Sequence, residues 1–148
     1  MFVDRPEAGR KAVVLHVHFR DPDSQAGTVV DDDASIGECV ELARTAGVDV
    51  VETVTATRDH PHPRAFVGSG KLEELKSCMQ MADADLLIVN HELGAGQQRN
   101  LERSLKCRVI SRTELILTIF ADRARTYEGQ LQVELAQLKH AQTRLVRG

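Results

Sequence analysis

The chain has 148 residues, of which 42% are hydrophobic, 28% charged and 3% aromatic. This balance predicts a soluble globular domain with an aliphatic core. No apolar run approaches the roughly 18 residues needed to span a bilayer, and residues 1–6 lack the apolar stretch of a signal peptide. We therefore exclude a membrane or secreted protein and expect a cytoplasmic one. The three cysteines, Cys39, Cys78 and Cys107, form no CxxC pair and are predicted to be free thiols.

Charge is distributed unevenly along the chain. The net charge is −3, but residues 1–96 contain 9 Lys and Arg against 17 Asp and Glu, whereas residues 97–148 contain 10 against 5. A basic C-terminal part suggests contact with an anionic partner. An ordinary solvated helix surface would give the same pattern.

Hydrophobic periodicity predicts alternating strands and helices. Strands are predicted at residues 12–19, 48–57, 85–90 and 108–111. Helices are predicted at residues 34–46, 71–82, 97–105, 112–124 and 130–147. This alternation favours an α/β fold with a mainly parallel four-stranded sheet flanked by helices.

The last predicted helix stands apart from this body. Residues 125–129 are taken as a boundary, which divides the chain into an α/β domain (1–125) and a long protruding C-terminal helix (126–148). Leu131, Leu135 and Leu138 form an apolar stripe that needs a partner. The stripe predicts the first half of a truncated helical hairpin whose second helix would follow Gly148, or self-association through the same leucines.

The segment Gly68-Ser69-Gly70-Lys71 is similar to the end of a phosphate-binding loop. The Walker pattern also needs a first glycine, separated by four residues from the Gly-Lys pair, and Ser or Thr after the lysine. This chain has Ala65 and Leu72 at those positions. Gly68, Gly70 and Lys71 are therefore a weak nucleotide-site candidate, because the start of a helix can still hold an anion.

Metal and catalytic sites are not predicted. His60, His62 and His91 lack the spacing of a metal site. His16 and His18 share one face of a strand and are expected to be hydrogen-bonded beside the core. No nucleophile–base pair or paired carboxylates can be recognised from spacing, so we expect the chain by itself not to be an enzyme.

The strongest functional candidates are five basic residues near the C-terminus. They are Arg123, Arg125, Lys139, Arg144 and Arg147. Arginine is suited to phosphate because its planar guanidinium donates two parallel hydrogen bonds. A protruding helix that carries these residues could follow an RNA backbone, with salt-dependent affinity. The scarcity of aromatic residues argues against stacking on single-stranded bases.

Two sequence blocks near the C-terminus are specific: RARTYEG at residues 123–129 and QVELAQL at 132–138. Three further blocks precede them: TRDHPHPRAFVGSGK at 57–71, QQRNLE at 97–102 and VISRT at 109–113. Together these blocks resemble the amino-terminal part of the HflX family of ribosome-associated GTPases. The resemblance covers roughly residues 46–148.

The resemblance implies a ribosome-contacting α/β domain, followed in the family by a helical hairpin and a GTPase domain. It implies that the parent protein binds the large ribosomal subunit and splits ribosomes under stress. GTP and Mg²⁺ would belong to the GTPase domain, whose Asp-x-x-Gly and Asn-Lys-x-Asp motifs do not occur in this chain. Two alternatives stay open: an independent ATP- or GTP-binding domain, and a regulatory or self-associating domain for that GTPase domain.

Overall fold

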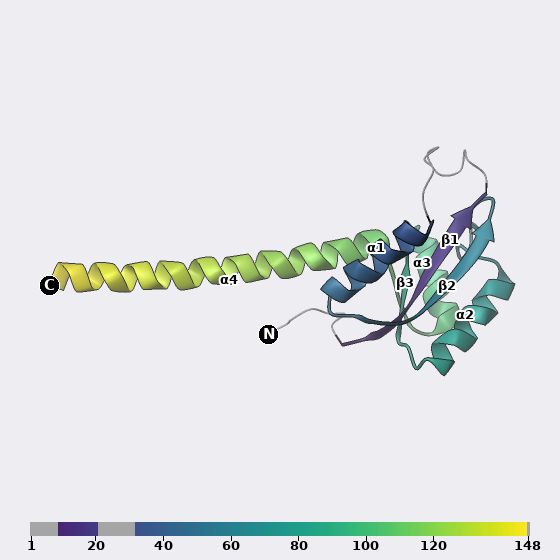
Figure 1. Ribbon diagram of the computed structural model, residues 1–148, viewed down its shortest axis with the longest axis horizontal. Coiled ribbons are helices and arrows are strands. Elements are labelled where there is room, and N and C mark those ends of the chain that lie inside the picture. Colours follow the sequence, from purple (N-terminus) through teal and green to yellow (C-terminus); the bar gives the residue numbers. More distant parts are fainter. Residues whose placement is uncertain (1–8, 21–31, 148) are drawn as a thin grey trace.

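A computed structural model describes residues 9–20 and 32–147, with side chains up to residue 141. The strands are β1 (Lys11–Phe19), β2 (Asp49–Arg58), β3 (Leu86–Val89) and β4 (Arg108–Ser111). The helices are α1 (Asp32–Thr45), α2 (Ser69–Met81), α3 (Ala95–Leu105) and α4 (Arg112–Arg147). Figure 1 shows a rounded body from which α4 projects far beyond the sheet.

The four strands form one parallel sheet in the order β2-β1-β3-β4. This confirms the predicted α/β class and the predicted parallel sheet. The apolar composition of β1 and β3 follows from their central positions, since a parallel sheet covered on both sides buries both faces of its inner strands. All four residues of β3 are buried.

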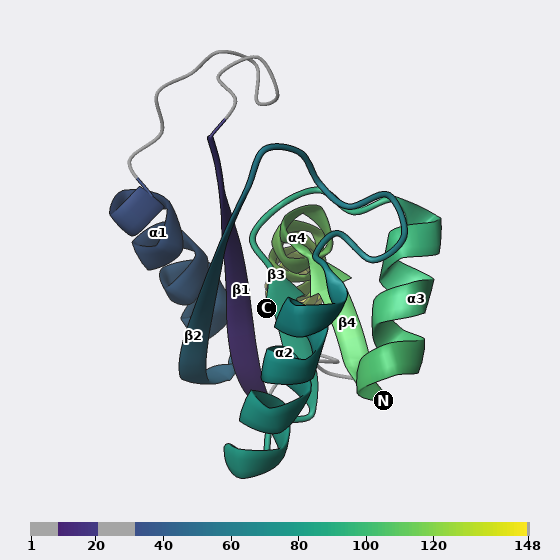
Figure 2. The ribbon, with the colours of Figure 1, turned by 90° about the vertical axis from the view of Figure 1, so that its right-hand side faces the viewer.

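Two helices cover each face of the sheet, as Figure 2 shows. Alternate residues of β1 point to opposite faces. On one face, Val13 and Leu15 pack in a core with Leu75 of α2 and Leu101 of α3. On the other face, Val14 packs in a second core, to which α1 and α4 contribute the side chains Cys39, Ala43, Leu115 and Ile119.

Helix α1 begins at two acidic residues. Asp32 and Asp33 lie in its first turn, where carboxylates interact favourably with the helix dipole. Gly47 follows the helix with a φ of 84°, a left-handed conformation that glycine adopts without steric cost. The helix was predicted to start at residue 34, which is two residues late, because Asp32 and Asp33 already belong to its first turn.

The predicted break between the last two helices is wrong, because α4 is continuous over 36 residues. Gly129 lies inside it, and a methyl group at that position would meet no atom within 4 Å. A glycine in an exposed helix costs only about 1 kcal/mol relative to alanine. That cost is too small to end a helix whose neighbours are mostly good helix formers. At about 1.5 Å per residue, α4 is roughly 54 Å long.

Candidate functional site

A buried polar cluster lies where β1 and β3 end. His16 of β1 is 4% exposed, and Asn90, directly after β3, is 3% exposed. The His16 Nδ1 atom accepts a hydrogen bond from Asn90 Nδ2 at 3.1 Å. His16 Nε2 therefore bears the ring proton and donates it to Asp32 Oδ1 at 2.7 Å. The second oxygen of Asp32 contacts His18 Nδ1.

Asn90 connects this cluster to Ser35 of α1 and to Arg112 at the start of α4. Its Nδ2 atom donates to the Ser35 hydroxyl at 3.0 Å and lies 3.2 Å from the Ser35 carbonyl oxygen. Its Oδ1 atom accepts from Arg112 Nη1 at 3.3 Å. Through Asn90, β1, α1 and the start of α4 are therefore fixed to one another by hydrogen bonds that are buried or partly buried.

His91 completes the cluster on the opposite face of the sheet. Its Nε2 atom accepts the Val17 backbone N–H at 2.9 Å, and its ring stacks on Phe66 with centroids 5.3 Å apart. Burial lowers the pKa of His91 to about 4, since the charged ring would lose its hydration. The hydrogen bond from His16 lowers the pKa of Asp32.

The cluster is a structural element, because its ring, amide and carboxylate groups bond to one another. The described residues include no group of three His, Cys, Asp or Glu side chains placed to hold a metal ion. His62 uses its Nδ1 to accept the Arg64 backbone N–H at 3.1 Å. The sequence anticipated hydrogen-bonded histidines in β1 but missed Ser35 and Arg112, which lie far from Asn90 in sequence and become its partners only in the fold.

Three of the five predicted basic residues lie on the exposed part of α4. Arg123, Arg125 and Lys139 are all exposed. Arg125 also forms an ion pair with Asp122 at 3.6 Å. Arg144 and Arg147 lie in the last turns of α4, where side chains are outside the described set.

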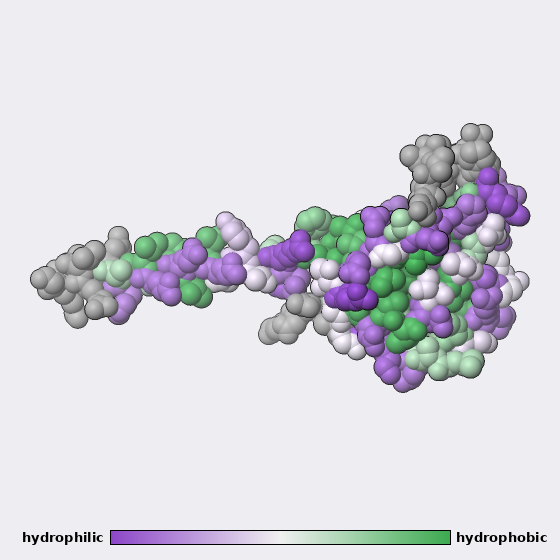
Figure 3. All heavy atoms as spheres, viewed as in Figure 1, coloured by the Kyte–Doolittle hydropathy of each residue, from purple (hydrophilic) through white to green (hydrophobic). Residues whose placement is uncertain are grey.

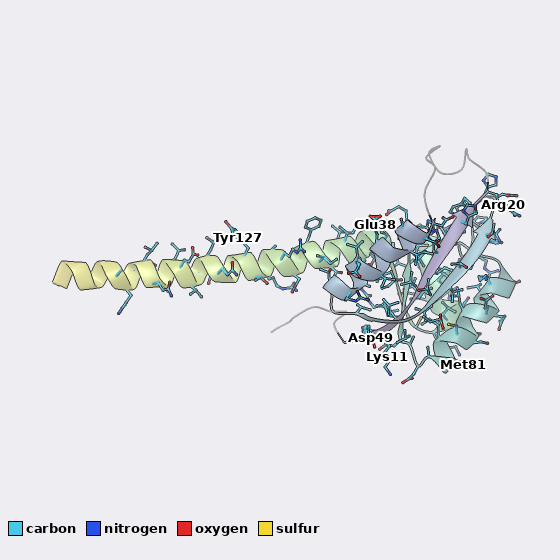
Figure 4. The ribbon with its side chains drawn as sticks, viewed as in Figure 1. Lys11, Arg20, Glu38, Asp49, Met81 and Tyr127 are labelled. Atoms are coloured by element: carbon cyan, nitrogen blue, oxygen red, sulfur yellow. The ribbon has the colours of Figure 1, made fainter. Side chains whose placement is uncertain are left out.

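An apolar stripe runs along another side of α4 and extends further than the three leucines predicted. Its exposed members are Leu117, Phe120, Tyr127, Leu131, Leu135 and Leu138. Because successive helix residues are rotated by about 100°, these six side chains lie within an arc of roughly 80° around the helix axis. Arg123, Arg125 and Lys139 lie outside this arc. Apolar side chains appear in green along the arm in Figure 3, and Tyr127 projects from it in Figure 4.

The predicted phosphate-loop residues lie at the start of α2. Gly68 is the N-cap, and Gly70 and Lys71 lie in the first turn. Lys71 Nζ donates to the Thr55 carbonyl oxygen and to Glu74 Oε1, both at 2.9 Å. The ammonium group of Lys71 therefore already has two protein partners, one in β2 and one in α2. A nucleotide site at Gly68, Gly70 and Lys71 stays a prediction.

Comparison with known proteins places this domain in a family. The family model described as GTP-binding GTPase N-terminal matches residues 33–121, which include most of the sheet, α2, α3 and the base of α4. The chain belongs to this family of amino-terminal GTPase domains. Within it, the chain is of the HflX type, which confirms the resemblance noted in the sequence.

Relatives named GTPase HflX match most of the chain. The protein of Escherichia coli strain K12 is 47% identical over 145 residues, which is 98% of this chain and 32% of that protein. The protein of Alkalihalophilus pseudofirmus is 50% identical over 111 residues, which is 75% of this chain and 26% of that protein. The chain thus spans about a quarter to a third of the length of the relatives it matches.

A solved structure shares the fold. It is a GTP-binding protein from the hyperthermophilic archaeon Sulfolobus solfataricus in complex with GDP, with a TM-score of 0.54 and 24% identity. The likeness covers 88% of this chain and 36% of that chain. In this chain, no helix within the described residues is both long and apolar enough to cross a membrane.

Proposed function

We propose that this chain is the ribosome-contacting module of an HflX-like GTP-binding protein that acts in the cytoplasm. The whole protein would bind the large ribosomal subunit and split ribosomes under stress. GTP hydrolysis, with GTP and Mg²⁺, would belong to a GTPase domain outside this chain. In this proposal residues 1–125 form the body and 126–148 the first helix of a hairpin arm.

The observation that carries the proposal is the arginine-bearing arm. α4 leaves the body as one long helix with Arg123 and Arg125 exposed just beyond the sheet and Lys139 further out. A rigid helix can enter a crowded ribonucleoprotein surface and present guanidinium groups to backbone phosphates. Two more arginines, Arg144 and Arg147, follow in the sequence of the same helix.

Replacing two of these arginines should weaken RNA binding. We expect Arg123→Ala/Arg125→Ala to lower affinity for purified large-subunit rRNA at least about tenfold, since charge-assisted hydrogen bonds are each worth roughly 1.5–3 kcal/mol. The dependence of log affinity on log salt should become shallower by about 1 to 2. Filter binding measures both quantities.

The matched control removes the same charge from the body. Arg44 of α1 and Arg99 of α3 are both exposed. We expect Arg44→Ala/Arg99→Ala to retain most of the affinity. Equal weakening in the two double variants would show only a net-charge effect and would count against a contact centred on the arm.

The apolar stripe favours a second function, self-association of two arms. We propose that Leu131, Leu135 and Leu138 bury against a second copy when no other partner is present, because exposed apolar stripes on helices associate. Leu135→Glu/Leu138→Glu should abolish a dimer in sedimentation velocity. Val133→Glu is the matched control, since Val133 is similarly exposed but lies on the opposite side of α4. A monomer at every concentration would end this proposal.

A further inference from the structure

Strand β2 lies at one edge of the sheet, where a row of its backbone groups has no strand to pair with. In the part of the chain that the structure describes, β1 is the only strand beside it. The Arg58 carbonyl oxygen accepts the Arg20 N–H at 2.9 Å, so the backbone of Arg58 faces β1. Because the backbone groups of successive strand residues point to opposite sides, those of Thr53, Thr55 and Thr57 point outward from the sheet.

Charged side chains occupy two of these outward groups. Glu52 Oε1 accepts the Thr53 N–H at 3.1 Å, and Lys71 Nζ donates to the Thr55 carbonyl oxygen at 2.9 Å. Each side chain takes the place that a neighbouring strand would fill. Charged residues at an open strand edge hinder unspecific pairing, so any strand that binds here must offer more than its backbone.

The edge is hollow beside the second half of β2. A cavity of about 340 Å³ lies between this half and the start of α2, and its lining includes Thr55, Thr57, Arg58 and Lys71. Thr55 and Thr57 are exposed. Neighbouring strands lie about 4.8 Å apart, and within the described residues no packed side chains fill that space along this half.

The sequence of β2 complements itself in an antiparallel pairing. Outward-facing residues must meet outward-facing residues, and one register that satisfies this rule places Thr55 opposite Thr55 of a second copy. The other pairs of this register are Thr53 with Thr57, Val54 with Ala56, and Glu52 with Arg58. Threonine pairs and opposite charges that lie directly across from each other both stabilise antiparallel strands.

The pairing of Glu52 with Arg58 occurs twice in such a symmetric dimer. Neither side chain forms an ion pair with another described residue. Arg58 Nε donates to the His60 carbonyl oxygen at 3.0 Å, which leaves Nη1 and Nη2 for a carboxylate. A shift of the register by two residues would separate the two charges, so this pair also selects the register.

We propose that β2 pairs with β2 of a second copy of this chain, antiparallel about Thr55, so that the two sheets become one continuous sheet. On association, Glu52 moves from the Thr53 N–H to Arg58 of the other copy. Lys71 releases the Thr55 carbonyl oxygen. Because these contacts within each chain are given up, the dimer is weak and forms at high concentration. The arm is not part of this interface, since α4 follows β4 at the opposite edge of the sheet.

Sedimentation velocity over a concentration series to about 1 mM tests the pairing. The parent for all variants is Leu135→Glu/Leu138→Glu, in which association through the arm is removed, and we expect it to form a concentration-dependent dimer. Thr55→Pro should abolish the dimer, because proline lacks the outward N–H while the bonds of β2 to β1 remain. Thr55→Val keeps this N–H and is the matched control. Lys71→Ala should strengthen the dimer about fivefold, since it frees the Thr55 carbonyl oxygen in both copies.

Charge reversal identifies the residues that meet across the interface. Glu52→Arg and Arg58→Glu each place like charges opposite one another, so each variant alone should dimerise at least about tenfold more weakly. An equimolar mixture of the two should dimerise about as strongly as the parent, because every pair across the mixed interface again has opposite charges. The same mixture with Thr55→Pro in both chains should stay monomeric, which excludes a general attraction between oppositely charged molecules.

Three results would overturn the proposal. A parent that is monomeric at every concentration, while the chain with intact Leu135 and Leu138 dimerises or not, would leave the edge of β2 to an extended segment of another protein. A dimer that persists in Thr55→Pro would place the interface elsewhere. A charge-reversal mixture that stays monomeric while the parent dimerises would contradict the pairing of Glu52 with Arg58.

Discussion

Asn90→Ala should lower the free energy of unfolding by about 3 kcal/mol. The substitution removes the donor to His16 Nδ1 and Ser35 and the acceptor for Arg112. A buried polar group left without its partner costs roughly 1–3 kcal/mol, and His16 and Ser35 are both buried. Urea denaturation measures the change directly.

Asn90→Leu separates lost hydrogen bonds from lost volume. Leucine fills a similar space but cannot bond His16 or Ser35, so most of the destabilisation should persist. Gln80→Ala, at an exposed site of α2, should change stability by less than about 0.5 kcal/mol. Wild-type stability in both Asn90 variants would contradict the structural role assigned to the cluster.

Acidification should destabilise the domain well above the pH at which carboxylates protonate. The pKa of His91 is about 4 in the fold against 6.5 when exposed. Below pH 6.5, His91 is therefore protonated in the unfolded chain but still neutral in the folded one. The free energy of unfolding decreases as the pH is lowered, until the folded His91 is also protonated near pH 4. A difference of about 2.5 pKa units corresponds to roughly 3 kcal/mol over this window.

Variants assign this pH dependence to one ring. His91→Gln should flatten the stability profile between pH 6.5 and 4, whereas His140→Gln, at an exposed site on α4, should leave it unchanged. Asp32, whose pKa is lowered below its ordinary value of 3.8, adds a loss only at still lower pH. An unchanged slope in His91→Gln would contradict the assignment.

The sequence predicted the sheet because each signal was local. Apolar runs marked β1 and β3, and helical spacing of apolar residues marked α1. The break in α4 was mispredicted because residues 125–129 were taken as a boundary, although good helix formers lie on both sides of them. The strand order could not be predicted from the sequence. It depends on pairing between β1 and β3, two strands that lie far apart in the chain.

Among the candidate sites, only the one formed by residues close together in sequence could be predicted. The arginines of the arm were visible in sequence because they are concentrated in one segment. The cluster around Asn90 was not, since His16 and Ser35 lie 74 and 55 residues away.

Co-sedimentation of this chain with purified large ribosomal subunits across a salt series tests the central proposal most directly. We predict binding at low salt that weakens steeply as salt increases, because counterions compete with the arm for phosphate. Arg123→Ala/Arg125→Ala should reduce the bound fraction throughout the series. Absence of binding at low salt, with α4 shown to be helical by circular dichroism, would contradict a ribosome contact carried by this chain.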